Sequence, residues 1–179
     1  MTNKKKNKIF WIVTLSLFAF ILTSLVSIAA ESFAPKVDLP KNMANRAMWV
    51  QMIEQWNIPS KETVGLPAYP GAVIVAYAAA SEMTANGVKY ETLPSLALST
   101  MDEPAKVAAF YKEKLKDWKY ERTFDMFDVF WTGREKFNSL DIREGMTTPN
   151  ITIMESTPQT NEFMPEAKTK ITIVFKPVK

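Results

Sequence analysis

The sequence predicts an α+β domain in which a mainly antiparallel sheet is covered on one face by a helix. Residues 150–155 and 170–176 alternate between apolar and polar side chains, which is typical of half-buried strands. Between about 102 and 117, apolar residues recur at helical spacing and charged residues occupy the opposite side. One helix on one face of a sheet is the simplest assembly of these elements. A hydrophobic leader and a separate amphipathic helix precede this domain.

The first 30 residues are set apart by charge and hydrophobicity. Residues 1–8 carry four lysines, and residues 9–30 contain no charged side chain. Small residues near Ala29 resemble a peptidase site, so this leader fits a cleaved signal peptide. The uncharged run is also long enough to span a bilayer, which leaves a retained single-pass anchor open. Under either interpretation residues 9–30 contact the membrane during export, and the rest is periplasmic or otherwise extracytoplasmic. An anchored chain would keep its N-terminus in the cytoplasm.

The basic charge of the chain belongs to the leader. The whole chain has 22 Lys and Arg against 19 Asp and Glu. Without the four lysines of residues 1–8, 18 basic residues remain against the same 19 acidic ones. A nearly neutral domain gives no support for nucleic-acid binding. We therefore expect no nucleic-acid partner, and expect instead the membrane and a protein of the cell envelope.

The composition removes many kinds of chemistry. The chain contains no Cys and no His, which excludes disulfides, Cys/His zinc sites and His-based catalytic triads. Its five glycines do not occur in the spacings of nucleotide-binding loops. We therefore expect no cofactor and no metal site. An enzyme is not excluded, but the missing motifs favour a non-catalytic protein.

Residues 31–68 are predicted to form a spacer, an amphipathic helix and a proline-containing connector. The helix is expected from about residue 40 to residue 56, with Asp38 as its cap. Its methionines and tryptophans predict an adaptable face for a protein partner or a membrane surface. The same face could instead dock on the domain's own sheet, or supply thioethers to Cu(I). The residues of this face are Met48, Trp49, Met52 and Trp56.

The α+β domain is expected to span residues 69–179. Residues 72–79 are apolar on both faces, which predicts a central strand. Asn86-Gly87 predicts a hairpin turn, and the return strand 88–100 is interrupted by Pro94.

Later elements follow the same logic. Asp102 is expected to cap the helix of residues 102–117. Residues 118–123 and 124–132 predict two further strands, while residues 134–145 fit either a short helix or a strand.

Three sequence fragments resemble a pattern found in small exported bacterial domains. Residues 69–72 are Tyr-Pro-Gly-Ala, and residues 100–102 are Thr-Met-Asp. Residues 107–115 then have the pattern Val-x-x-Phe-Tyr-x-x-x-Leu of a helix. The resemblance implies an extracytoplasmic α+β domain and no settled activity. Many such proteins are lipoproteins, and this chain lacks the cysteine that lipid attachment needs.

Asp128 is the most unusual acidic residue because it lies within a strongly apolar strand. Strand alternation places it on the face of Phe130, with Trp131 on the other face. A carboxylate in such surroundings could bind a ligand or act as an acid or base, together with Trp131 and Arg134. The alternative is an edge strand whose aspartate points to solvent. The neighbouring aromatic residues could line a ligand pocket or simply form the core.

These observations favour a non-catalytic extracytoplasmic binding or accessory domain of the cell envelope. One alternative is a single-pass membrane subunit of an envelope complex, held by residues 9–30. The other is an enzyme that uses carboxylates without His, Cys or a nucleotide, with Asp128 and Arg134 as its candidate residues.

Overall fold

A computed structural model describes most of the 179-residue chain after the leader. The described residues are 31–85, 87–124, 126–138, 140–158 and 161–178. The predicted leader therefore lies outside them. Within these ranges, no helix has the length and apolar character needed to cross a bilayer.

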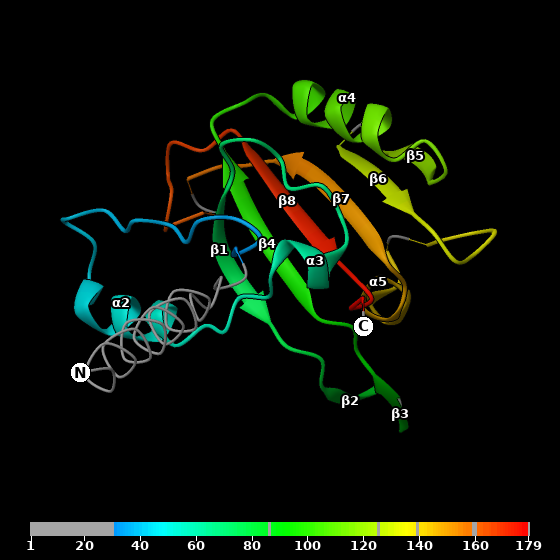
Figure 1. The fold of residues 1–179 in the computed structure, drawn as a ribbon, viewed down its shortest axis with the longest axis horizontal. Coiled ribbons are helices and arrows are strands. Elements are labelled where there is room, and N and C mark those ends of the chain that lie inside the picture. Colours follow the sequence, from blue (N-terminus) through cyan, green and yellow to red (C-terminus); the bar gives the residue numbers. More distant parts are fainter. Residues whose placement is uncertain (1–30, 86, 125, 139, 159–160, 179) are drawn as a thin grey trace, which may run out of the picture. The chain divides into compact units, whose positions relative to one another are not determined.

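The fold is α+β and is built on a six-stranded antiparallel sheet, as the sequence predicts (Figure 1). Its strands lie in the order β1-β4-β8-β7-β6-β5. Their bounds, in that order, are Val73–Ala78, Ser95–Thr100, Thr169–Val174, Asn150–Glu155, Phe127–Trp131 and Lys119–Thr123. Helix α4 (Pro104–Lys114) covers one face, where Val107 and Tyr111 are buried.

The strand register gathers the core under α4. Leu98 of β4 lies opposite Ile171 of β8, which lies opposite Ile153 of β7. All three side chains are fully buried, and they form one hydrophobic cluster with Val107 and Tyr111 of α4. Alternation along each strand sends every second residue to this face, so the predicted helix-on-sheet packing is confirmed.

The opposite face is covered in part by helix α2 (Arg46–Glu54). Ile53 of α2 is buried in a second hydrophobic cluster that includes Val75 of β1. The segment before β1 also reaches the first cluster, because Phe33 and Val64 are buried there. Residues 31–179 accordingly form one compact unit, and the short helix α3 (Lys61–Val64) belongs to it.

Strand β1 is an edge strand, so the prediction of a central strand at residues 72–79 is wrong. Its apolar character has another cause, because both of its faces are covered: Ile74 packs in the first cluster and Val75 in the second. A bulge between Ile74 and Ala76 adjusts this register. On its outer side, Ile74 pairs in parallel with Lys36, which protects part of the edge.

The two predicted caps are also wrong. Helix α2 begins after Asn45, and the side chain of Asp38 pairs with Arg46 instead. Helix α4 begins after Glu103, whose side chain makes no cap bond. The carboxylate of Asp102 is already engaged elsewhere, as described below.

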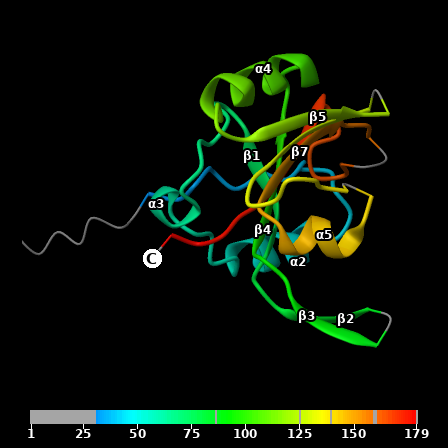
Figure 2. The same cartoon turned by 90° about the vertical axis from the view of Figure 1, so that its right-hand side faces the viewer.

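Strand β2 (Glu82–Ala85) pairs with β3 (Val88–Glu91) in a hairpin, as the predicted turn requires, and Ala85 lies opposite Val88. These two strands form a separate ribbon that projects from one end of the sheet (Figures 1 and 2). The predicted return strand 88–100 is therefore two strands, and buried Pro94 lies between them. The ambiguous segment near residue 140 contains a short helix, α5 (Ile142–Thr147).

Candidate functional site

Asp128 is buried in β6 and faces α4, as alternation predicts. Its cross-strand neighbours are Arg122 of β5 and Ile153 of β7. The Tyr120 hydroxyl donates to Oδ1 at 2.5 Å, and the Arg122 guanidinium contacts Oδ2 at 3.2 Å. Asp128 is only 3% exposed, so the alternative of a solvent-facing aspartate is wrong.

This arrangement engages both carboxylate oxygens of Asp128. The nearby guanidinium compensates the buried negative charge, and the phenol adds a hydrogen bond to it. Both partners belong to β5, so the interactions hold the last strand of the sheet against β6. A small cavity of about 240 Å³ adjoins this pair, and Met126 and Pro104 also line it.

The other two residues of the predicted site lie elsewhere. Trp131 points to the opposite face of the sheet, where its ring stacks on Phe137 at a centroid distance of 5.7 Å. Its indole nitrogen is buried and has no hydrogen-bond partner among the described residues. Arg134 pairs with Glu144 of α5 at 2.8 Å. The structure therefore does not bring Asp128, Trp131 and Arg134 into one site.

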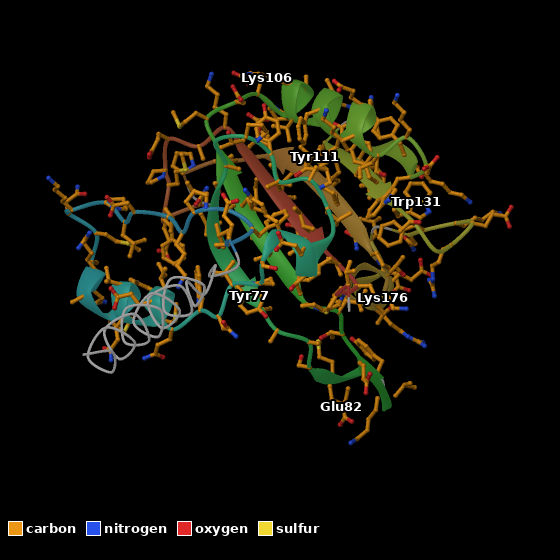
Figure 3. All side chains as sticks on the ribbon, viewed as in Figure 1. Tyr77, Glu82, Lys106, Tyr111, Trp131 and Lys176 are labelled. Atoms are coloured by element: carbon orange, nitrogen blue, oxygen red, sulfur yellow. The ribbon has the colours of Figure 1, made fainter. Side chains whose placement is uncertain are left out.

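A second polar cluster, which the sequence did not reveal, joins the start of α4 to the chain before β1. The Tyr69 hydroxyl donates to Asp102 Oδ2 at 2.7 Å, and Lys106 Nζ donates to Oδ1 at 2.8 Å. Thr169 of β8 donates to the Asp102 carbonyl at 2.6 Å. Lys106, labelled in Figure 3, comes from the first turn of α4.

The cluster shifts the acidities of its members. Burial and the hydrogen bond to Asp102 raise the pKa of Tyr69 from 10.0 to about 12. Hydrogen bonds from Lys106 and Tyr69 lower the pKa of Asp102 below its ordinary value. The cluster connects two of the three sequence fragments described above, since Tyr69 belongs to residues 69–72 and Asp102 to residues 100–102. These two fragments, far apart in the sequence, therefore meet through a side-chain hydrogen bond.

A cleft of about 500 Å³ lies beside Tyr69. It is lined by residues 31–35 and 68–72, together with Lys61. Lys61 and Glu31 pair with each other at 2.8 Å, which leaves a lining made largely of apolar groups.

The predicted methionine and tryptophan face divides into two sets, and Trp56 lies just beyond α2, which ends at Glu54. Trp49 packs edge-on against Phe163 at 5.1 Å, and Trp56 packs against both hydrophobic clusters. Met48 and Met52, one turn apart, are 56% and 38% exposed. The tryptophans therefore anchor the helix to the domain, whereas the two methionines face solvent.

Among the described residues, no group of three Asp or Glu side chains is placed to hold a metal ion.

Comparisons with protein-family models, curated proteins and solved structures find no match to this chain. The proposal of function therefore depends on the contacts and exposed surfaces described above, together with the sequence of the leader.

Proposed function

We propose that this chain is a non-catalytic extracytoplasmic domain that binds or assists a protein partner in the cell envelope. The observation that carries the proposal is the division of α2 into a docked side and an exposed side. Ile53 and Trp49 hold the helix on the domain, so Met48 and Met52 are presented on a fixed support. Flexible thioether side chains suit an adaptable protein-binding surface.

The leader supports the location in this proposal. Lysines before an uncharged run orient a chain with its C-terminal part across the membrane. The folded unit begins at residue 31, directly after that run. If the leader is cleaved, the domain is released as a periplasmic or secreted protein. If it is retained, the chain is a single-pass subunit whose α2 surface works near the bilayer, which is the second candidate.

Location can be tested on the full chain expressed in a bacterial host. The proposal expects the domain either in the periplasmic or culture fraction or on spheroplasts, where added protease digests it while a cytoplasmic marker stays intact. The intact mass of the protein from the released fraction or from the membrane fraction, measured without protease treatment, then separates the two candidates. A mass that lacks about 30 residues indicates cleavage, and a full-length mass in membrane fractions indicates the anchored subunit. A domain that stays with the spheroplasts and is digested only after they are lysed would contradict export.

The partner surface can be tested with a photoreactive amino acid at Met52 in intact envelopes. The matched control is the same amino acid at Met126, which is 61% exposed but lies in the β5–β6 turn. We expect a discrete protein adduct from position 52 and none from position 126. Met48→Glu should weaken the adduct at position 52, because it places a charge on the same exposed surface. Equal labelling at both positions would argue against a specific surface on α2.

A further inference from the structure

The ribbon of β2 and β3 is not paired with the six-stranded sheet. In the described part of the chain, its two strands pair with each other and with no other strand. An isolated two-stranded ribbon is marginally stable in water, and its edges can pair with another chain. Val88, near its tip, is 51% exposed, and the ribbon extends away from the sheet (Figure 2).

The phase of the ribbon's hydrogen bonds shows which backbone groups face outward. Thr92 donates its N–H to the Ser81 carbonyl at 2.8 Å, which makes this a hydrogen-bonded pair. Such pairs alternate along an antiparallel ladder, so Lys89 and Glu91 direct their N–H and C=O groups away from β2. Neither makes a backbone hydrogen bond to described residues outside the ribbon.

The charges on the same strand are incompletely paired. Glu91 lies directly opposite Glu82, an unfavourable arrangement of like charges. Lys89 forms an ion pair with Glu82 at 2.6 Å (Glu82 is labelled in Figure 3). No ion pair of Glu91 is found among the described residues. Glu91 is therefore an acidic side chain beside an open strand edge and without a cation of its own.

We propose that β3 pairs antiparallel with β3 of a second copy of this chain, across a two-fold axis at Tyr90. In this register Lys89 of each copy lies opposite Glu91 of the other. These two pairs exchange the outward backbone hydrogen bonds, and each brings a lysine next to the unpaired glutamate. The product is a four-stranded sheet with the order β2-β3-β3-β2. The edge of β2 offers only Glu82 and Thr84 and has no such complementarity.

Helix α5 positions the edge for this pairing. The N–H of Leu93, just after β3, donates to the Met146 carbonyl at 2.8 Å, and the Arg143 guanidinium lies 6.0 Å from the Tyr90 ring. The base of the ribbon is thus attached to the domain while its outer edge stays open. Val88 lies on the same face of β3 as Tyr90, so a second copy would also cover exposed apolar surface there.

The full chain contains no cysteine, so a single introduced thiol reports on this register. Tyr90→Cys places the thiol on the axis, where paired Cα atoms would be about 4.5 Å apart, within the range of a disulfide. Lys89→Cys is the matched control, because residue 89 faces residue 91 of the other copy. We expect mild oxidation of the full chain to link Tyr90→Cys at least about tenfold more than Lys89→Cys.

Glu91→Lys separates loss of the interface from loss of the ribbon. Within one copy it places Lys opposite Glu82 and removes the repulsion, so the ribbon is retained. Across the axis it opposes Lys89 with a second lysine. We expect it to lower the linked fraction of Tyr90→Cys by about tenfold. The further change Lys89→Glu restores opposite charges across the axis and should recover linking.

Sedimentation of the unmodified full chain in detergent gives an independent measurement. The proposal expects a reversible monomer–dimer equilibrium that Glu91→Lys shifts to monomer. A chain that stays monomeric at every concentration would overturn it, as would equal linking at positions 89 and 90. Open-ended oligomers would overturn the two-fold register, because a closed symmetric pair stops at two copies.

Discussion

The six-stranded sheet and the β2–β3 ribbon differ in how far their side chains are buried and how their charges are paired. In the sheet, Leu98 and Ile171 are fully buried, and even the charge of Asp128 is enclosed and paired. In the ribbon, Val88 is half exposed and Glu91 lacks a cation in the described structure. From this contrast we expect stability to be concentrated in the sheet, whereas the ribbon keeps an open strand edge, the edge that we propose pairs with a second copy.

The largest expected effect is on the sheet core. Ile171→Ala removes a fully buried side chain from the cluster beneath α4 and should lower the free energy of unfolding by about 2–5 kcal/mol. The matched control is Ile142→Ala on α5, where the side chain is 69% exposed and the change should stay within about 0.5 kcal/mol. Chemical denaturation of dilute protein measures both. Similar losses at the two positions would contradict the location of the core.

Asp128→Asn tests the polar part of the sheet. The substitution removes the charge that compensates Arg122 and weakens the bond to Tyr120, so we expect a loss of about 1–3 kcal/mol. The control Glu121→Gln changes an exposed acid on the neighbouring strand and should have little effect. An unchanged or increased stability of Asp128→Asn would indicate a costly acid kept for function, and would reopen the catalytic interpretation.

Tyr69→Phe tests the link between α4 and the chain before β1. It removes one hydrogen bond to Asp102, and we expect a loss of about 0.5–1.5 kcal/mol at neutral pH. The effect should change with pH. The pKa of Tyr69 is raised to about 12 in the folded protein, so its contribution is complete below pH 10 and is lost as pH rises to about 12.

The free energy of unfolding of wild type and Tyr69→Phe is measured by chemical denaturation from pH 8 to pH 12. Tyr120→Phe is the control, because it removes a tyrosine hydroxyl that bonds to Asp128 and not to Asp102. The difference in stability between wild type and Tyr69→Phe should shrink above pH 10. A difference that grows over this range would show that the phenol is not stabilised in its neutral form.

The smallest effect is expected in the ribbon. Val88→Ala should change the free energy of unfolding by less than about 0.5 kcal/mol, since the side chain is half exposed. The same substitution at Val129 of β6, which is 1% exposed, should cost about 1–3 kcal/mol. Both changes convert valine to alanine in a strand, so the pair isolates burial as the cause. Equal costs would remove the distinction between sheet and ribbon.

Local patterns in the sequence predicted most of the elements. The alternating strands near residues 150–155 and 170–176, the helix containing Val107 and the hairpin with Gly87 in its turn are all present. The turn requires a positive φ at Gly87, which is 75° and suits glycine. These features depend on neighbours within a few residues, so they can be recognised without knowing the fold.

The candidate site could be predicted only in part. The apolar neighbours of Asp128 left both burial and exposure open in the sequence, and the β5–β6 pairing placed Arg122 opposite it. The Tyr69–Asp102 bond joins residues 33 positions apart, and nothing in their spacing specifies the contact. The separation of Trp131 from Asp128 follows directly from strand alternation. Their spacing in the sequence did not indicate that Trp131 would stack on Phe137 or that Arg134 would pair with Glu144 of α5.

Side-chain periodicity was enough to predict the α+β class and the type of most elements, because both depend on residues close together in the chain. Tertiary structure alone decided that β1 is an edge strand, that residues 88–100 divide between ribbon and sheet, and that Asp102 binds Tyr69. Strand order and distant polar contacts depend on which surfaces cover each other in three dimensions. Periodicity identifies an apolar face, but not the element that covers it.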